Sequence, residues 1–285
     1  MKSILQRLYR FTSPKFQTLF NEYPVEFKPR YGHGKAAHDR LYGIVNGERA
    51  NYRELLNHSR EFWPILQEIK AQGNESNPSK PAWNNGFLPG LDILGLYTIL
   101  SVYKPKHYIE VGSGNSTKVA KLARENQGLD LEITSIDPHP RAEIDHLADH
   151  IIRHPFERID AHQYTELNKG DILFIDNSHR ILPNSDAMVF FLEILPNLKP
   201  GVIVHIHDIY IPYDYPQFMC DRFYSEQYGL SIAMIENPQR YKTILPNYFI
   251  SEDEELSSLL LDFWKHPNLV DVERHGGSFW IVISS

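Results

Sequence analysis

The stretch from His107 to Thr117 reads HYIEVGSGNST and holds the feature that decides the fold. A short apolar strand at 107–111 runs into a turn that contains Gly112 and Gly114, and a helix is expected to follow at 116–126. Glycine allows the backbone to turn tightly and to approach a ligand closely. The start of a helix presents N–H groups that have no helical acceptor and that suit an anionic or polar ligand. This order predicts a strand, a turn and a helix that together bind a ligand.

The next strand indicates what kind of ligand this turn binds. Strand 131–136 ends at Asp137, where a carboxylate can bind the two hydroxyls of a ribose, so a nucleoside cofactor is expected. Thr117 occupies the position of the third glycine in the Gly-x-Gly-x-x-Gly pattern, which disfavours NAD and FAD. Glu110 stands directly before the turn and favours a cofactor with a cationic group over one with a pyrophosphate. S-adenosylmethionine carries a sulfonium and an ammonium group and no phosphate.

The composition excludes several classes of partner. The chain has 285 residues, is 42% hydrophobic and carries a formal net charge of −7, so no basic excess is available to neutralise a nucleic acid. Its single cysteine, Cys220, cannot form an internal disulfide, which fits a reducing cytoplasm. No apolar run approaches the length of about 18 residues that a membrane span needs. We therefore expect a cytoplasmic protein that binds neither nucleic acid nor membrane.

From residue 88 onward, apolar strands alternate with helices, which predicts a doubly wound sheet. We expect an α/β fold with a Rossmann-like, mostly parallel, seven-stranded sheet whose last strand is antiparallel. Strands 171–176 and 201–206 are almost continuously apolar, as central strands covered on both faces should be. Residues 1–87 contain no clear strand and are predicted to form a mainly helical N-terminal extension of the domain at 88–285. The other expected strands are 150–153, 241–245 and a closing strand in the run 276–283, and the other expected helices are 141–148, 161–167, 185–195, 217–228 and 253–264.

Four ionisable residues follow the fourth and fifth strands, at the edge where open α/β sheets bind ligands. Asp176 ends the fourth strand, His179 lies three residues later, and His207 and Asp208 end the fifth strand. One interpretation is a divalent metal held by Asp176, His207 and Asp208. A second is a metal-free site in which His179 or His207 takes a hydroxyl proton near neutral pH and Asp208 orients the imidazole. A third gives these residues a purely structural role.

The motifs in their order resemble those of class I S-adenosylmethionine-dependent methyltransferases. The first motif is at 109–117 and the second at 135–138. The segments 174–179 and 205–208 resemble a subgroup with Ile-Asp-x-x-His and His-Asp motifs after strands four and five, and the resemblance covers residues 88–285. It implies a set of cofactor-binding residues: Glu110, Gly112, Ser113 and Gly114 around the methionine part, Asp137 on the ribose, Phe156 near the adenine, and Asp176 at the end of strand four.

The resemblance also implies a reaction. In catechol-type O-methyltransferases, which this chain resembles, a metal-binding Asp ends strand four and a basic residue lies three positions later, here Asp176 and His179. We therefore expect an enzyme that moves a methyl group from S-adenosylmethionine to a hydroxyl of a small molecule, such as a natural product or a saccharide. The candidate catalytic residues are His179, His207 and Asp208. A divalent metal such as Mg is a second expected cofactor in one of the interpretations above.

Two other functions fit parts of the sequence. Two histidines and Asp208 resemble the ligand set of an iron-dependent oxygenase, although the glycine turn would then have no role. A non-catalytic module that binds S-adenosylmethionine and acts through residues 1–87 is the other alternative. The state of assembly is open, and a homodimer is one of the expected arrangements.

Overall fold

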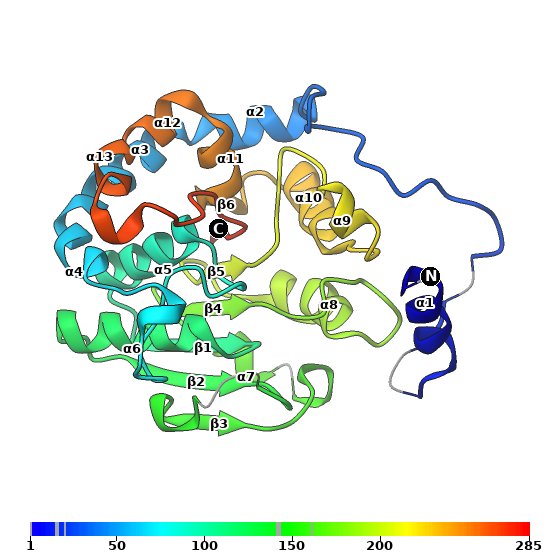
Figure 1. Cartoon of the computed structure of the whole chain (residues 1–285), viewed down its shortest axis with the longest axis horizontal. Helices are drawn as coiled ribbons and strands as arrows, with labels where there is room; N and C mark the ends of the chain where they lie inside the picture. The colour runs from blue at the N-terminus through cyan, green and yellow to red at the C-terminus, as the bar shows by residue number, and fades with distance from the viewer. Residues whose placement is uncertain (1, 15–16, 20, 141–143, 161) are drawn as a thin grey trace.

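The computed structural model describes residues 2–14, 17–19, 21–140, 144–160 and 162–285, and it contains a seven-stranded sheet (Figure 1). The strand order is β3-β2-β1-β4-β5-β7-β6. The pairs from β3 to β5 are parallel, whereas β7 runs antiparallel to both β5 and β6. The predicted fold class is therefore confirmed. The strands are β1 His107–Val111, β2 Glu132–Ile136, β3 His150–Ile152, β4 Ile172–Ile175, β5 Ile203–Ile206, β6 Tyr241–Pro246 and β7 Phe279–Ile283.

The register of the parallel strands brings their carboxyl ends to one edge of the sheet. Val111 pairs with Ile136 of β2 and with Ile175 of β4, and Ile175 pairs with Ile206 of β5. All four residues of β4 and of β5 are buried, because helices and loops cover both faces of these central strands. The residues that directly follow β1, β2, β4 and β5 are consequently neighbours, although they lie up to about a hundred residues apart in the chain.

Helices flank the sheet, and the longest are α5 and α6. Twelve of the fourteen residues of α5 are buried, so this helix is a central part of the core rather than a surface element. The helices are α1 Lys2–Thr12, α2 Asp39–Gly47, α3 Arg49–His58, α4 Trp63–Gln67, α5 Gly90–Tyr103, α6 Asn115–Gln127, α7 His162–Thr165, α8 Asp186–Val189, α9 Gln217–Cys220, α10 Glu226–Glu236, α11 Asn247–Glu252, α12 Glu254–Ser258 and α13 Leu261–Trp264.

Several predicted helices are shorter than expected or are divided. The predicted helix 217–228 is two helices, α9 and α10, because Phe223 adopts a φ of 62° that no right-handed helix can contain. The predicted helix 185–195 begins as α8, continues as a π-helical turn at Phe190–Ile194 and ends as a 3-10 turn at Leu195–Asn197. Residues 141–143 of the helix predicted at 141–148 lie outside the described residues, and 145–147 form only a single tight turn. The helices predicted at 161–167 and 253–264 are represented by α7 and by α12 and α13.

The N-terminal part of the chain has two different arrangements. Helix α1 lies apart from the body of the molecule, at the end of an extended segment (Figure 1). Residues of α2, α3 and α4, by contrast, bury apolar side chains in the same core as the sheet, among them Val45, Tyr52 and Leu66. The boundary predicted at residue 87 remains a prediction. No helix among the described residues has the length and apolar character needed to cross a membrane.

Candidate active site

One cavity of about 670 Å³ lies at the carboxyl ends of β1, β2 and β4. This volume is in the range of sites that bind small molecules. The glycine turn and Asp137 form one side of the cavity, and Asp176 and His179 form another. Glu110, His207 and Asp208 do not line it. The predicted site residues on the wall are Gly112, Ser113, Gly114, Asp137, Phe156, Asp176 and His179.

The two glycines of the turn have different roles. Gly112 has a φ of 83°, and a Cβ atom there would lie 1.9 Å from the carbonyl oxygen of Asp176. Only glycine can therefore occupy this point, where the turn after β1 crosses the end of β4. Gly114 precedes α6, and a Cβ atom there would have no other atom within 4 Å. The space in front of α6 is thus open to the cavity.

Glu110 lies beneath this turn and is completely buried. Its carboxylate accepts hydrogen bonds from the hydroxyls of Ser116 at 2.7 Å, of Tyr108 at 3.1 Å and of Thr117. Burial raises the pKa of Glu110 to about 7 although these hydroxyls stabilise the ionised form. The side chain joins β1 to the first turn of α6. Its predicted contact with the methionine part of a cofactor stays a prediction.

Asp137 is fixed at the end of β2 by two backbone groups. One carboxylate oxygen accepts a hydrogen bond from the N–H of Ser113 at 3.1 Å, and the other accepts from the N–H of His139 at 2.8 Å. Phe156 also lies on the cavity wall, and its ring is 5.1 Å from that of Tyr164. A carboxylate and an aromatic ring therefore stand on the wall where the sequence places ribose and adenine contacts.

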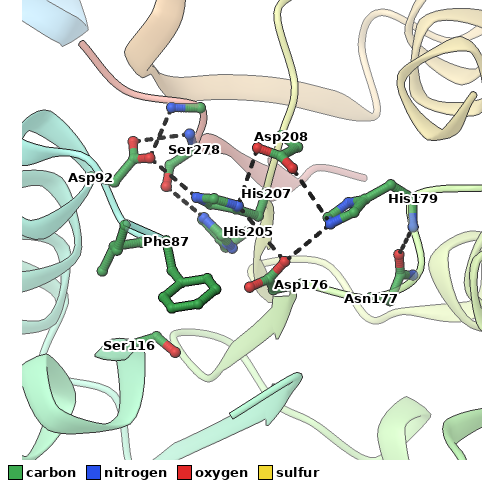
Figure 2. Close-up of polar contacts among 12 residues, drawn as sticks. Phe87, Asp92, Ser116, Asp176, Asn177, His179, His205, His207, Asp208 and Ser278 are labelled. Carbon is green, nitrogen blue, oxygen red and sulfur yellow. Dashed lines mark hydrogen bonds and ion pairs between the residues drawn. The ribbon is translucent and has the colours of Figure 1, made fainter. Parts of the chain in front are cut away.

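The structure brings the four residues after β4 and β5 together in a closed arrangement. Asp176 and Asp208 each lie between the imidazole rings of His179 and His207 (Figure 2). His179 Nε2 is 3.4 Å from Asp176 Oδ1 and 3.5 Å from Asp208 Oδ2. His207 Nδ1 is 3.7 Å from Asp176 Oδ1 and 3.5 Å from Asp208 Oδ1. Each carboxylate thus contacts both imidazoles.

The second ring nitrogen of His207 contacts a carboxylate that the sequence analysis did not identify. Its Nε2 is 3.2 Å from Oδ2 of Asp92, which projects from α5 and is completely buried. Burial opposes the charged imidazole, but the carboxylates of Asp176 and Asp208 and the contact with Asp92 raise the pKa of His207 to about 10. His207 is therefore an imidazolium near neutral pH. Asp92 also accepts hydrogen bonds from the Asn247 side chain and from the backbone N–H groups of Gly277 and Ser278.

His179 is held in the same manner by a second buried carboxylate. Its Nδ1 is 3.1 Å from Oε2 of Glu226, at the start of α10. Its ring also stacks on Tyr224, with the ring centroids 4.7 Å apart. Burial lowers the pKa of His179, but Glu226, Asp208 and Asp176 outweigh this effect and raise it above its ordinary value. Unlike His207, His179 lines the cavity.

Sequence reasoning missed Asp92 and Glu226. A signal for Asp92 was available, because it is the only charged residue in the otherwise apolar helix α5, and a charged residue is rarely buried without a partner. Glu226 gave no such signal, since an acidic residue in the first turn of a helix is ordinary.

The structure does not show the metal site predicted at Asp176, His207 and Asp208. Among the residues that the structure describes, no group of three or more His, Cys, Asp or Glu side chains could hold a metal ion. Asp176, His207 and Asp208 make the histidine–carboxylate contacts given above. A divalent metal at these residues stays a prediction of the sequence.

One family model matches a part of the chain. Residues 109–209 match the family model described as "Methyltransferase domain". The match covers about a third of the chain. The matched segment runs from the third residue of β1 to beyond β5 and includes every predicted site residue. No curated protein matches the chain.

Solved structures of methyltransferases are similar to the chain only at a low level. The SAH-bound methyltransferase PaMTH1 of Podospora anserina shares 13% identity, with 80% of this chain and 88% of that chain covered and a TM-score of 0.44. The plantazolicin methyltransferase BpumL, in complex with SAH and a monoazolic desmethylPZN analog, shares 13% identity, with 85% and 100% covered and a TM-score of 0.42. Because both TM-scores are below 0.5, these similarities carry no argument about function.

Proposed function

We propose that this protein transfers a methyl group from S-adenosylmethionine to a hydroxyl oxygen of a small molecule. One observation carries the proposal: a single cavity contains both the nucleoside-binding features and a histidine suited to take a proton. The glycine turn and Asp137 form the cofactor half of this cavity, and Asp176 and His179 form the acceptor half. The methyltransferase-domain match over residues 109–209 supports the same reaction class.

The residues of the cofactor half fit S-adenosylmethionine. The open space at Gly114 gives a ligand access to the backbone before α6, and the carboxylate of Asp137 is positioned to accept hydrogen bonds from ribose hydroxyls. Phe156 provides an apolar surface for the adenine ring. When bound, this cofactor supplies a methyl group on a positively charged sulfur that leaves as a neutral thioether.

In the acceptor half, His179 is the residue that takes the proton. Its Nε2 points toward Asp176 on the cavity wall, whereas His207 is off the wall and already protonated near neutral pH. In the transfer, the acceptor oxygen forms a bond to the methyl carbon while the carbon–sulfur bond breaks and its electron pair stays on sulfur. The hydroxyl proton moves to Nε2 of His179, and the carboxylates of Asp176 and Asp208 stabilise the imidazolium that results.

His207 and Asp208 then have positioning roles. The imidazolium of His207 holds the two carboxylates in place, and Asp208 links the two rings. The proposed transfer uses His179 as the base, and none of its steps is assigned to a metal ion. The nature of the acceptor, a natural product or a saccharide, is left to experiment.

Binding and turnover measured together test this proposal. Calorimetry is expected to show that S-adenosylmethionine binds to the wild type and to Asp130→Asn, and that Asp137→Ala loses most of this affinity. Asp130 is a matched control because it is an exposed carboxylate just before β2, at the end opposite to Asp137. A screen of small hydroxylated compounds by mass spectrometry is expected to find products heavier by one methylene unit.

Each alternative function gives a different outcome in the same experiments. An oxygenase would show no affinity for S-adenosylmethionine. A non-catalytic binding module would bind it, yet no compound in the screen would gain a methyl group. Either outcome would overturn the proposal.

A further inference from the structure

Glu226 is a buried carboxylate whose only hydrogen-bonding partner among the described side chains is a residue of the active site. It is 1% exposed, and its Oε2 lies 3.1 Å from Nδ1 of His179. Its other oxygen, Oε1, is buried without any hydrogen-bond partner among the described residues. An incompletely paired buried carboxylate costs stability, because charge is removed from water with little compensation. Such a group calls for an explanation other than stability.

We propose that Glu226 is the positioning residue for His179, a role that rests on the proposed function. A neutral imidazole carries its proton on one nitrogen and a lone pair on the other, and a hydrogen bond to one nitrogen selects which. In this role Glu226, 3.1 Å from Nδ1, accepts the hydrogen bond from Nδ1–H, and the lone pair lies on Nε2, on the side of Asp176 and Asp208. Once Nε2 has taken a proton, the carboxylate of Glu226 stabilises the positive ring.

The backbone places this pair without help from the Glu226 side chain. The N–H groups of Ser225 and Glu226 both donate to the carbonyl oxygen of His179, at 2.9 and 3.3 Å. Tyr224 stacks on the imidazole and fixes the plane of the ring. His179 itself has a φ of 59°, a strained value that the surrounding contacts must maintain. Replacement of the side chain at 226 therefore leaves the loop anchored to α10.

Comparison with Asp92 supports a functional rather than a structural role. Asp92 accepts three hydrogen bonds besides its contact with His207. Burial alone would raise the pKa of Asp92, but His207 and the hydrogen-bond donors together lower it. Glu226 has only His179, and burial raises its pKa. Asp92 is thus stabilised as a permanent counter-ion, whereas Glu226 is coupled to one imidazole alone. That is the arrangement needed where the imidazole changes its protonation during a reaction.

Two replacements at position 226 and one control test the proposal. Glu226→Leu removes the acceptor for Nδ1–H, and Glu226→Gln removes the charge but keeps an oxygen that can accept. Glu236→Gln is the control, because this exposed residue ends the same helix, about 15 Å along its axis from Glu226. The readouts are kcat, KM for the acceptor, Kd for S-adenosylmethionine, and the tautomer of His179.

The tautomer is read by nitrogen NMR at a pH where the ring is neutral, and the signal is assigned with His179→Gln. The groups that face His179 and influence its titration are Asp176, Asp208 and Glu226, with Tyr224 stacked on the ring. In the wild type we expect the proton on Nδ1. In Glu226→Leu we expect it to move to Nε2, with kcat lowered about 100-fold and with KM and Kd changed less than about twofold.

Glu226→Gln decides the proposal even where Glu226→Leu fails to fold. If the amide oxygen faces His179, the tautomer is kept and kcat falls only about tenfold. If the amide nitrogen faces His179, the tautomer reverses and kcat falls about as far as in the leucine variant. Either result supports the proposal, because turnover follows the tautomer. A low kcat with an unchanged tautomer, or an unchanged kcat with a reversed one, overturns it.

Failure of the proposed function is distinguishable from failure of this inference. The tautomer is measured without cofactor or acceptor. A wild type that does not bind S-adenosylmethionine would refute the reaction, while a proton found on Nε2 of wild-type His179 would refute the positioning role alone.

Discussion

The two halves of the cavity are built in different ways. The cofactor half is built on the turn after β1 and the end of β2, where Gly112 has no room for a side chain and Asp137 is fixed by two N–H groups. The acceptor half consists of the side chains of Asp176 and His179, which are held in place by residues from separate parts of the chain. Asp92 lies 115 residues from its partner His207, and Glu226 lies 47 residues from His179.

This difference determines how each half responds to change. A substitution in the cofactor half acts on a turn that also packs against the end of β4. It therefore affects folding as well as binding. A defect in the acceptor half removes one side chain from a set that several elements hold in place, so it affects turnover first. The predictions below test this separation, from the largest expected effect to the smallest.

Replacement of His179 is expected to produce the largest effect, and only on turnover. His179→Gln keeps a polar side chain of similar size but removes the group that takes the proton. A positioned general base contributes about 10² to 10⁴ in rate, so we expect kcat to fall about 10³-fold. Steady-state kinetics and calorimetry together are expected to show this loss with the affinity for S-adenosylmethionine retained.

His58→Gln is the control for this variant, because His58 is an exposed residue at the end of α3 and lines no part of the cavity. It should retain the wild-type kcat. A His179→Gln protein that turned over at the wild-type rate would remove His179 from the reaction and direct attention to His207.

Alanine at the two glycines is expected to separate folding from binding within the cofactor half. Gly112→Ala places a Cβ atom 1.9 Å from the Asp176 carbonyl oxygen at a φ of 83°, so we expect the free energy of unfolding to fall by at least about 3 kcal/mol. Gly114→Ala meets no other atom within 4 Å, so we expect a smaller change in stability and a weaker affinity for S-adenosylmethionine. Urea denaturation and calorimetry measure the two effects. Equal losses of stability in both variants would contradict this division of roles.

Glu110 is expected to make the stability of the cofactor half depend on pH. Burial raises the pKa of this carboxyl from 4.5 to about 7 in the folded protein, so the folded state binds its proton more tightly than the unfolded state does. The contribution to stability is full below pH 4.5 and declines as the pH rises to about 7. Over that window, wild type should lose about 3 kcal/mol relative to Glu110→Gln, as measured by urea denaturation at several pH values.

Tyr108→Phe sharpens this test. It removes one hydroxyl that donates to the ionised carboxylate of Glu110, so the pKa should rise further and the window should extend to higher pH. If the difference in free energy of unfolding between wild type and Glu110→Gln stayed constant from pH 4.5 to 7, burial would not raise the pKa of Glu110.

The cofactor half was largely predictable from the sequence because its signals are local. Glycine at 112 and 114, an apolar run before each turn and an acid after β2 all lie within about 30 residues of one another. Each reflects a constraint that acts on neighbouring residues, such as a positive φ or a buried strand. The predicted bounds of β1 to β5 accordingly differ from the observed ones by at most two residues.

The acceptor half was predictable only in part. The residues after β4 and β5 could be identified because strand order brings their positions together. Their partners could not, since contacts with Asp92 and Glu226 depend on how α5 and α10 pack against the sheet. The prediction of one helix over 217–228 also concealed that α10 begins at Glu226, directly beside His179.

Removal of metal ions is expected to have the smallest effect and tests the acceptor half most directly. Because the proposed transfer uses His179 as the base and assigns no step to a metal, dialysis against a chelator should leave kcat within about twofold of the untreated protein. Methyl transfer to the same acceptor, measured before and after dialysis and after addition of Mg²⁺, provides the comparison. A loss of turnover that Mg²⁺ restores would instead support the divalent metal expected from the sequence. The contacts of 3.4 to 3.7 Å among these four side chains would then describe only the metal-free protein, and the separation between the two halves would no longer hold.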